Sequence, residues 1–163
     1  MRNFFLLLII FYFLTLFQIS FLNFLKVQPN FIFILFLFIL IFGKSNNFKV
    51  LSAFLAGLFL DIFSNLILGT TIMTFLLIYF LIKIILDNFR KINLYTLSIL
   101  IILGTLIFEL LLPLNSYLFS KFFGSSNFLQ FNFNYTLFLK LIYNLILGLL
   151  GFYMLKLYRY KPT

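Results

Sequence analysis

The chain contains no cysteine and no histidine, and only three of its 163 residues are acidic. Without cysteine there is no disulfide and no thiolate nucleophile, and without histidine the most common general base and metal ligand are missing. Asp61 and Glu109 lie within hydrophobic segments, but no nucleophile–base pair, metal-ligand set or phosphate-binding loop accompanies them. We therefore expect a protein that is not an enzyme and that holds no metal and no cofactor.

The residues that are present are mostly apolar. The chain is 64% hydrophobic and 9% charged, with a mean hydropathy of +1.20 and 28 phenylalanines. A water-soluble domain of this length presents a charged exterior, which this composition cannot supply. Apolar runs of roughly 18 residues or more recur along the chain, and such runs indicate helices that span a bilayer.

The arrangement of the apolar runs predicts an all-α polytopic membrane protein with one integral membrane domain over residues 1–163. Six transmembrane helices are expected at about 4–25, 31–43, 50–68, 72–86, 94–112 and 135–155. Pro29 is well placed to precede the second helix, and Pro113 is expected to stop the fifth. The first segment lacks a small-residue cleavage site, so we expect it to stay in the membrane.

The net charge of +9 predicts orientation rather than a nucleic-acid partner, because the basic residues are unevenly placed. With six spans and both termini cytoplasmic, nine basic residues lie inside and three outside. The inner side holds Arg2, Lys44, Lys49, Lys83, Arg90, Lys91, Lys156, Arg159 and Lys161, and the outer side holds Lys26, Lys121 and Lys140. This bias favours an N-in/C-in topology.

Asp61 stands in the segment AGLFLDIFSNLILGTT, inside the third predicted span. Leu, Ile, Phe and Val residues in that span contribute about −0.3 to −0.6 kcal/mol each to insertion, which offsets roughly +3 kcal/mol for one central Asp. Ala53, Gly57, Asp61 and Ser64 share one stripe of small or polar residues, the pattern that lets two helices approach closely. The stripe, followed by Gly69, is either a structural packing seam or a seam that binds a partner.

Glu109 and Lys140 are predicted at similar depth from the outer side, in the fifth and sixth spans. An ion pair between adjacent antiparallel helices is one interpretation; the other is that both side chains extend to the outer interface. Asn144 continues a small, polar stripe below Lys140. Gln18 and Asn23 in the first span are expected to make packing hydrogen bonds.

The third span resembles a motif of the MreD family of bacterial rod shape-determining proteins. The matching positions are Gly57, Leu58, Asp61 and Gly69, within GLFLD and LGTT, and QPNFIFIL with Pro29 leads into the second span in a similar way. Chain length and the number of spans also agree with that family.

The resemblance implies a multi-pass, non-enzymatic scaffold of the bacterial inner membrane that supports peptidoglycan synthesis and cell shape. It implies an MreC-like bitopic partner and, through it, MreB, the RodA glycosyltransferase and a class B penicillin-binding protein. It also implies a fold similar to the substrate-binding subunits of energy-coupling-factor transporters.

Two alternatives stay open at this point. A vitamin-binding subunit of an energy-coupling-factor transporter would share the fold, but it needs several convergent polar groups, and the outer half of this chain offers few. A small pore or proton-coupled carrier would use the two membrane acids, yet it lacks a second polar helix face.

Overall fold

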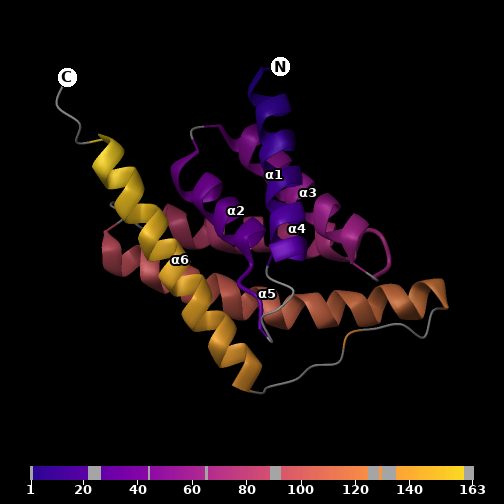
Figure 1. Ribbon diagram of the computed structural model, residues 1–163. Coiled ribbons are helices and arrows are strands. Elements are labelled where there is room, and N and C mark those ends of the chain that lie inside the picture. Colours follow the sequence, from indigo (N-terminus) through magenta and orange to yellow (C-terminus); the bar gives the residue numbers. More distant parts are fainter. Residues whose placement is uncertain are drawn as a thin grey trace.

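The computed structural model describes residues 2–21, 27–43, 45–64, 66–88, 93–124, 129 and 135–159, and these residues form an all-helical protein (Figure 1). The predicted all-α class is confirmed. The helices are α1 (Arg2–Phe21), α2 (Phe31–Phe42), α3 (Asn46–Phe63), α4 (Thr70–Asp87), α5 (Leu94–Phe123) and α6 (Tyr135–Arg159).

Helix α2 is the centre of the bundle, because it contacts each of the other five helices. Its twelve residues are all apolar, and a helix that is hydrophobic on every side is stable only when it is buried. Asn30 begins the helix by accepting a hydrogen bond from the backbone N–H of Phe33 at 3.0 Å. At 1.5 Å per residue α2 is about 18 Å long, so it does not cross the roughly 30 Å hydrocarbon core by itself.

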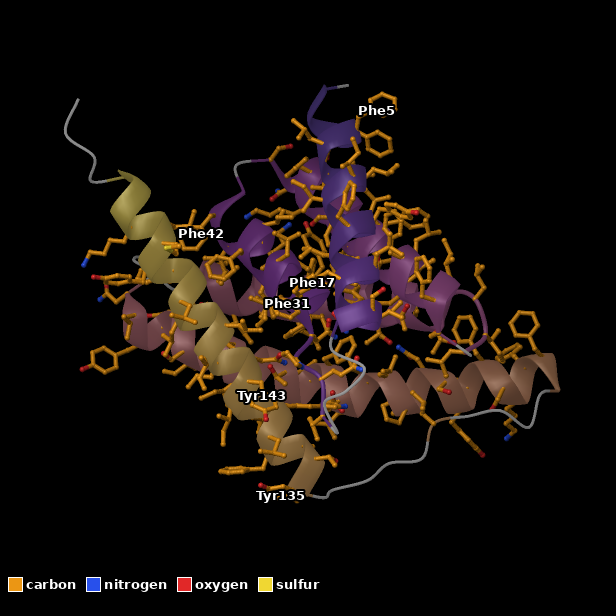
Figure 2. All side chains as sticks on the ribbon, in the orientation of Figure 1. Phe5, Phe17, Phe31, Phe42, Tyr135 and Tyr143 are labelled. Atoms are coloured by element: carbon orange, nitrogen blue, oxygen red, sulfur yellow. The ribbon has the colours of Figure 1, made fainter. Side chains whose placement is uncertain are left out.

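Aromatic rings fill the interior and also cover the outside. Phe33, Phe75 and Phe108 from α2, α4 and α5 form a cluster with ring centroids 5.2 to 6.2 Å apart. Phe5 on α1 is 60% exposed and points away from the bundle in Figure 2. Large exposed apolar side chains on most helices fit a protein whose outer surface contacts lipid.

Within the described residues, four helices are long and apolar enough to cross a membrane, namely α3, α4, α5 and α6, and the apolar parts of α1 and α2 are shorter. The chain is therefore a membrane protein, and the part of it that the structure describes contains six helices, of which four rather than the expected six have full spanning length. The N-in/C-in orientation stays a prediction. Several basic residues on which it depends lie outside the described residues, namely Lys26, Lys44, Arg90, Lys91 and Lys161.

The third helix ends earlier than the sequence pattern indicated. Helix α3 stops at Phe63 rather than Leu68, because Ser64 takes an extended conformation with φ −96° and ψ 157°. The chain then turns back, and α4 begins at Thr70 after Gly69, whose φ of +103° favours glycine. The helices α3 and α4 consequently pack side by side as an antiparallel hairpin.

The expectation that Pro113 ends the fifth helix is wrong. Helix α5 continues for ten residues beyond it, to Phe123, and in Figure 1 this end projects past the other helices. Packing against α4 holds the extension: the buried Asn115 side chain donates to Oγ1 of Thr74 at 2.9 Å. A proline inside a membrane helix is tolerated where neighbouring elements supply such contacts.

Candidate functional site

Asp61 is almost completely buried, with 4% of its surface exposed, at the end of α3. Its Oδ2 atom accepts hydrogen bonds from the backbone N–H groups of Gly69 at 2.7 Å and Ile72 at 3.3 Å. Its Oδ1 atom accepts from the N–H of Thr71 at 2.9 Å. Both carboxylate oxygens are therefore directed at the first turn of α4.

This contact explains why a carboxylate stands in so apolar a helix. The first turn of any α-helix leaves N–H groups without an intrahelical acceptor, and a residue at the N-cap normally supplies one. The N-cap of α4 is Gly69, which has no side chain, so Asp61 of α3 supplies the acceptors instead. A negative charge at a helix N-terminus is also favoured by the helix dipole.

Gly57 lies one helical turn before Asp61 and allows the two helices to touch. A Cβ atom at Gly57 would collide with the backbone of Ile72 and Thr71 on α4. The hydroxyl of Thr71 donates to the carbonyl oxygen of Gly57 at 2.6 Å, so the close approach also forms a hydrogen bond. Gly57, Asp61 and Thr71 together make what we call the hairpin lock.

The remaining residues of the predicted stripe lie around the hairpin lock. Ala53 is fully buried in the apolar core, one turn before Gly57. Ser64 is not on the helix but directly after it, where its hydroxyl lies 3.3 Å from the carbonyl oxygen of Asp61. The structure therefore brings Gly57, Asp61 and Gly69 into the α3–α4 contact, leaves Ala53 in the apolar core and places Ser64 in the turn.

Glu109 and Lys140 form a separate site between α5 and α6. The Lys140 Nζ atom donates to both carboxylate oxygens of Glu109 at 2.9 Å. The Lys140 side chain is 37% exposed and that of Glu109 20% exposed, so the pair is much more open than Asp61.

The ion pair lines a cavity of about 600 Å³. Its polar lining comes from α1, from the segment before α2, from α5 and from α6. The principal polar residues are Gln18, Gln28, Asn30, Glu109, Lys140 and Asn144. Asp61 is not among the lining residues, so the two acidic sites are separate.

Asn144, which lines this cavity, connects α6 to the segment before α2 and to α5. It is 2% exposed; its Oδ1 accepts from the N–H of Asn30 at 3.0 Å, and its Nδ2 lies 3.4 Å from Oγ1 of Thr105. One turn further along α6, Gly148 lies directly over Ile101 of α5, where a Cβ atom would collide. The polar stripe of α6 therefore faces the bundle.

Sequence analysis missed two features of these sites. Thr71 is part of the LGTT motif, but nothing local indicates that its hydroxyl bonds to Gly57 across the hairpin. Gln18 was expected to make a packing hydrogen bond, but its Oε1 atom is buried and has no partner among the described residues. Asn23 lies outside the described residues. No group of three potential metal-ligating side chains occurs in the part of the chain that the structure describes.

Comparison with known proteins gives one result. The model of a family described as rod shape-determining protein MreD matches residues 1–161. No curated protein and no solved structure matches the chain, so the expected likeness to transporter subunits stays a prediction.

Proposed function

Because the chain belongs to the MreD family of rod shape-determining proteins, we propose that it is a non-enzymatic scaffold of the cell-elongation complex in the bacterial inner membrane. Family membership assigns it a role in rod shape determination. The finer part of the proposal is that it binds an MreC-like bitopic protein and thereby supports peptidoglycan synthesis. Contacts to MreB, RodA and a class B penicillin-binding protein would be indirect.

The observation that carries this proposal is the extent of the family match, which covers 161 of the 163 residues. The chemistry of the hairpin lock supports a structural role. Both oxygens of Asp61 are engaged by backbone N–H groups, so this carboxylate is already used within the fold. Its role in the proposal is to hold the α3–α4 turn in one conformation.

The orientation in the membrane is part of the proposal. The start of α1 and the end of α6 lie on the same side of the bundle in Figure 1, which fits two termini in one compartment. We expect that side to be cytoplasmic, because the sequence places more basic residues there. The α3–α4 turn then faces outward.

The turn that Asp61 holds carries exposed apolar side chains. Ile62 is 55% exposed and Leu68 66% exposed, on either side of the short turn. In the proposed orientation they lie near the outer membrane surface, where the membrane helix of a bitopic partner leaves the bilayer. Ala53, Gly57 and Asp61 would therefore act on the partner through the position of the turn, and Leu68 would contact it directly.

Co-expression of the tagged chain with the MreC-like protein of the same genome tests the proposal. The wild-type chain is expected to retain that protein through purification in mild detergent. Leu68→Asn should lower retention about tenfold, which corresponds to about 1.4 kcal/mol. Ile84→Asn is the matched control, because Ile84 is 64% exposed near the other end of α4.

The two parts of the proposal fail in different ways. A wild-type chain that is monodisperse but retains no MreC-like protein contradicts the scaffold function. Equal retention by Leu68→Asn and Ile84→Asn leaves the scaffold in place and moves the partner surface away from the α3–α4 turn.

A vitamin-binding subunit of an energy-coupling-factor transporter is the second candidate. The observation in its favour is the cavity of about 600 Å³, a size typical of small-ligand sites, with amide and charged groups in its wall. Equilibrium dialysis of the purified protein against water-soluble vitamins separates the candidates. Retention of one vitamin at micromolar concentration would favour the transporter subunit, and no retention is expected of the scaffold.

A further inference from the structure

The cavity between α1, α5 and α6 concentrates polar groups in a chain that has few of them. Only 9% of the residues are charged, yet this one cavity contains both members of an ion pair together with four amide side chains. Its volume of about 600 Å³ is many times the roughly 30 Å³ that a water molecule occupies. A space of this size and polarity fits a ligand better than a packing defect.

Gln18 indicates what the ligand must supply. Its Oε1 atom is buried and finds no donor among the described residues. A buried acceptor that is left unsatisfied destabilises a protein, and native proteins contain few of them. Gln18 lines the cavity, so a rotation of its amide brings Oε1 to the cavity wall, where an N–H or O–H group of a ligand supplies the missing donor.

The ion pair indicates the charge of the ligand. Lys140 uses two of its three N–H donors on Glu109, and each carboxylate oxygen of Glu109 has a second lone pair. The cavity wall thus offers one cationic donor beside one anionic acceptor. A ligand that carries an ammonium group and an anionic oxygen matches both, whereas a ligand of one sign would meet repulsion from half of the pair.

An apolar groove on α1 distinguishes a lipid from a soluble zwitterion. The groove has a volume of about 430 Å³ and is lined by Phe13, Leu14, Leu16, Phe17 and Ser20. Leu14 lies four residues before Gln18, so the two side chains share one face of α1. Figure 2 shows Phe17 beside Phe31, at the start of α2, and their ring centroids are 5.8 Å apart. A polar cavity and an apolar groove thus adjoin along one helix.

We propose that the cavity binds the headgroup of a zwitterionic phospholipid, with an acyl chain in the groove along α1. The ammonium group donates to Glu109 and to Oε1 of Gln18, and the phosphate accepts from Lys140. This site is independent of the scaffold function, because it rests on the cavity and not on the α3–α4 turn.

Lipid retention by the full-length protein in detergent tests the site. The protein is incubated with equimolar phosphatidylethanolamine and phosphatidylglycerol, washed, and analysed by native mass spectrometry. The wild-type chain is expected to retain phosphatidylethanolamine at least tenfold better. Gln18→Leu should abolish this preference without lowering the unfolding temperature, since Oε1 of Gln18 makes no hydrogen bond within the described residues.

The controls keep the test decisive. Asn88→Leu removes an exposed amide at the end of α4 and should retain the wild-type preference. Glu109→Gln removes the acceptor charge but keeps the shape, and it should also lose the preference for phosphatidylethanolamine. This variant replaces Gln18→Leu in the test if Gln18→Leu does not fold. Equal retention of the two lipids by the wild type, or a preference that Gln18→Leu and Glu109→Gln both keep, overturns the site.

A soluble zwitterion is the alternative ligand for the cavity. It is tested with glycerophosphoethanolamine, which has the same headgroup without acyl chains. We expect it to bind at least a hundredfold more weakly than phosphatidylethanolamine, because it gains nothing from the groove. Binding as tight as that of the lipid overturns the assignment to a phospholipid and identifies a soluble zwitterion as the ligand.

Discussion

Asp61 and Glu109 are both acidic side chains inside the same helical bundle, but their surroundings differ in kind. Asp61 is 4% exposed and bonded to three backbone N–H groups of α4, which belong to fixed secondary structure. Glu109 is 20% exposed and bonded to one long side chain at the wall of a cavity. The partners of each carboxylate, rather than the carboxylate itself, determine what it can do.

The difference follows from where hydrogen-bond donors exist in a membrane protein. The N–H groups at the start of α4 face a carboxylate that is almost completely buried, so losing this acceptor is costly. Lys140 is 37% exposed and can reorient its flexible side chain toward solvent or a ligand. Asp61 therefore contributes to the fold, and Glu109 is available to a ligand.

Asp61→Leu should have the largest effect of any single substitution at these two sites. It leaves three N–H groups without acceptors at about 1–3 kcal/mol each, so we expect a loss on the order of 4 kcal/mol in the free energy of unfolding. Asp61→Asn should lose about half as much, since one amide oxygen still accepts. Equilibrium unfolding in mixed micelles measures both values.

Glu109→Gln is the matched control for Asp61→Leu. It should lower the free energy of unfolding by about 1 kcal/mol or less. The comparison between the two carboxylates is wrong if Glu109→Gln destabilises the protein as much as Asp61→Leu. The comparison is also wrong if the Asp61→Leu variant unfolds at the same mole fraction of denaturing detergent as the wild type.

Gly57→Ala should have the next largest effect, because the added methyl group collides with the backbone of Ile72. Overpacking of this kind costs typically 1–3 kcal/mol, and we expect about 2 kcal/mol here. Gly104→Ala is the control on α5: its nearest neighbours are the Phe33 and Ile82 side chains at 3.2 and 3.3 Å, which can shift. The same unfolding measurement should show a smaller loss for Gly104→Ala, and the reverse order would contradict the close approach of α3 and α4.

Much of the architecture could be predicted from the sequence, because apolar runs separated by polar turns are strong signals in a membrane protein. The starts of the helices at Phe31, Leu94 and Tyr135 agree with the expected boundaries. The resemblance at Gly57 and Asp61 also agrees with the family match. These signals are local, so a single sequence contains them.

The parts that could not be predicted depend on contacts between distant residues. The continuation of α5 beyond Pro113 relies on a hydrogen bond from Asn115 to Thr74, 41 residues away in sequence. The end of α3 at Phe63 is set by a turn that lets Asp61 reach the N-terminus of α4. Local patterns do not encode either partner.

Substitutions in the Glu109–Lys140 ion pair should have the smallest effect on the free energy of unfolding. This effect should depend on both residues together. Lys140→Gln and Glu109→Gln are expected to cost about 1 kcal/mol or less each, since the pair is partly exposed. The exchanged protein, with Glu109→Lys and Lys140→Glu together, should be more stable than either of its single substitutions, because each of those places two like charges at the same distance. A double-mutant cycle measured by unfolding should give a coupling of about 0.5–1 kcal/mol. If the exchanged protein folds no better than its single variants, the pair contributes no interaction energy, and Glu109 and Lys140 act on the cavity independently.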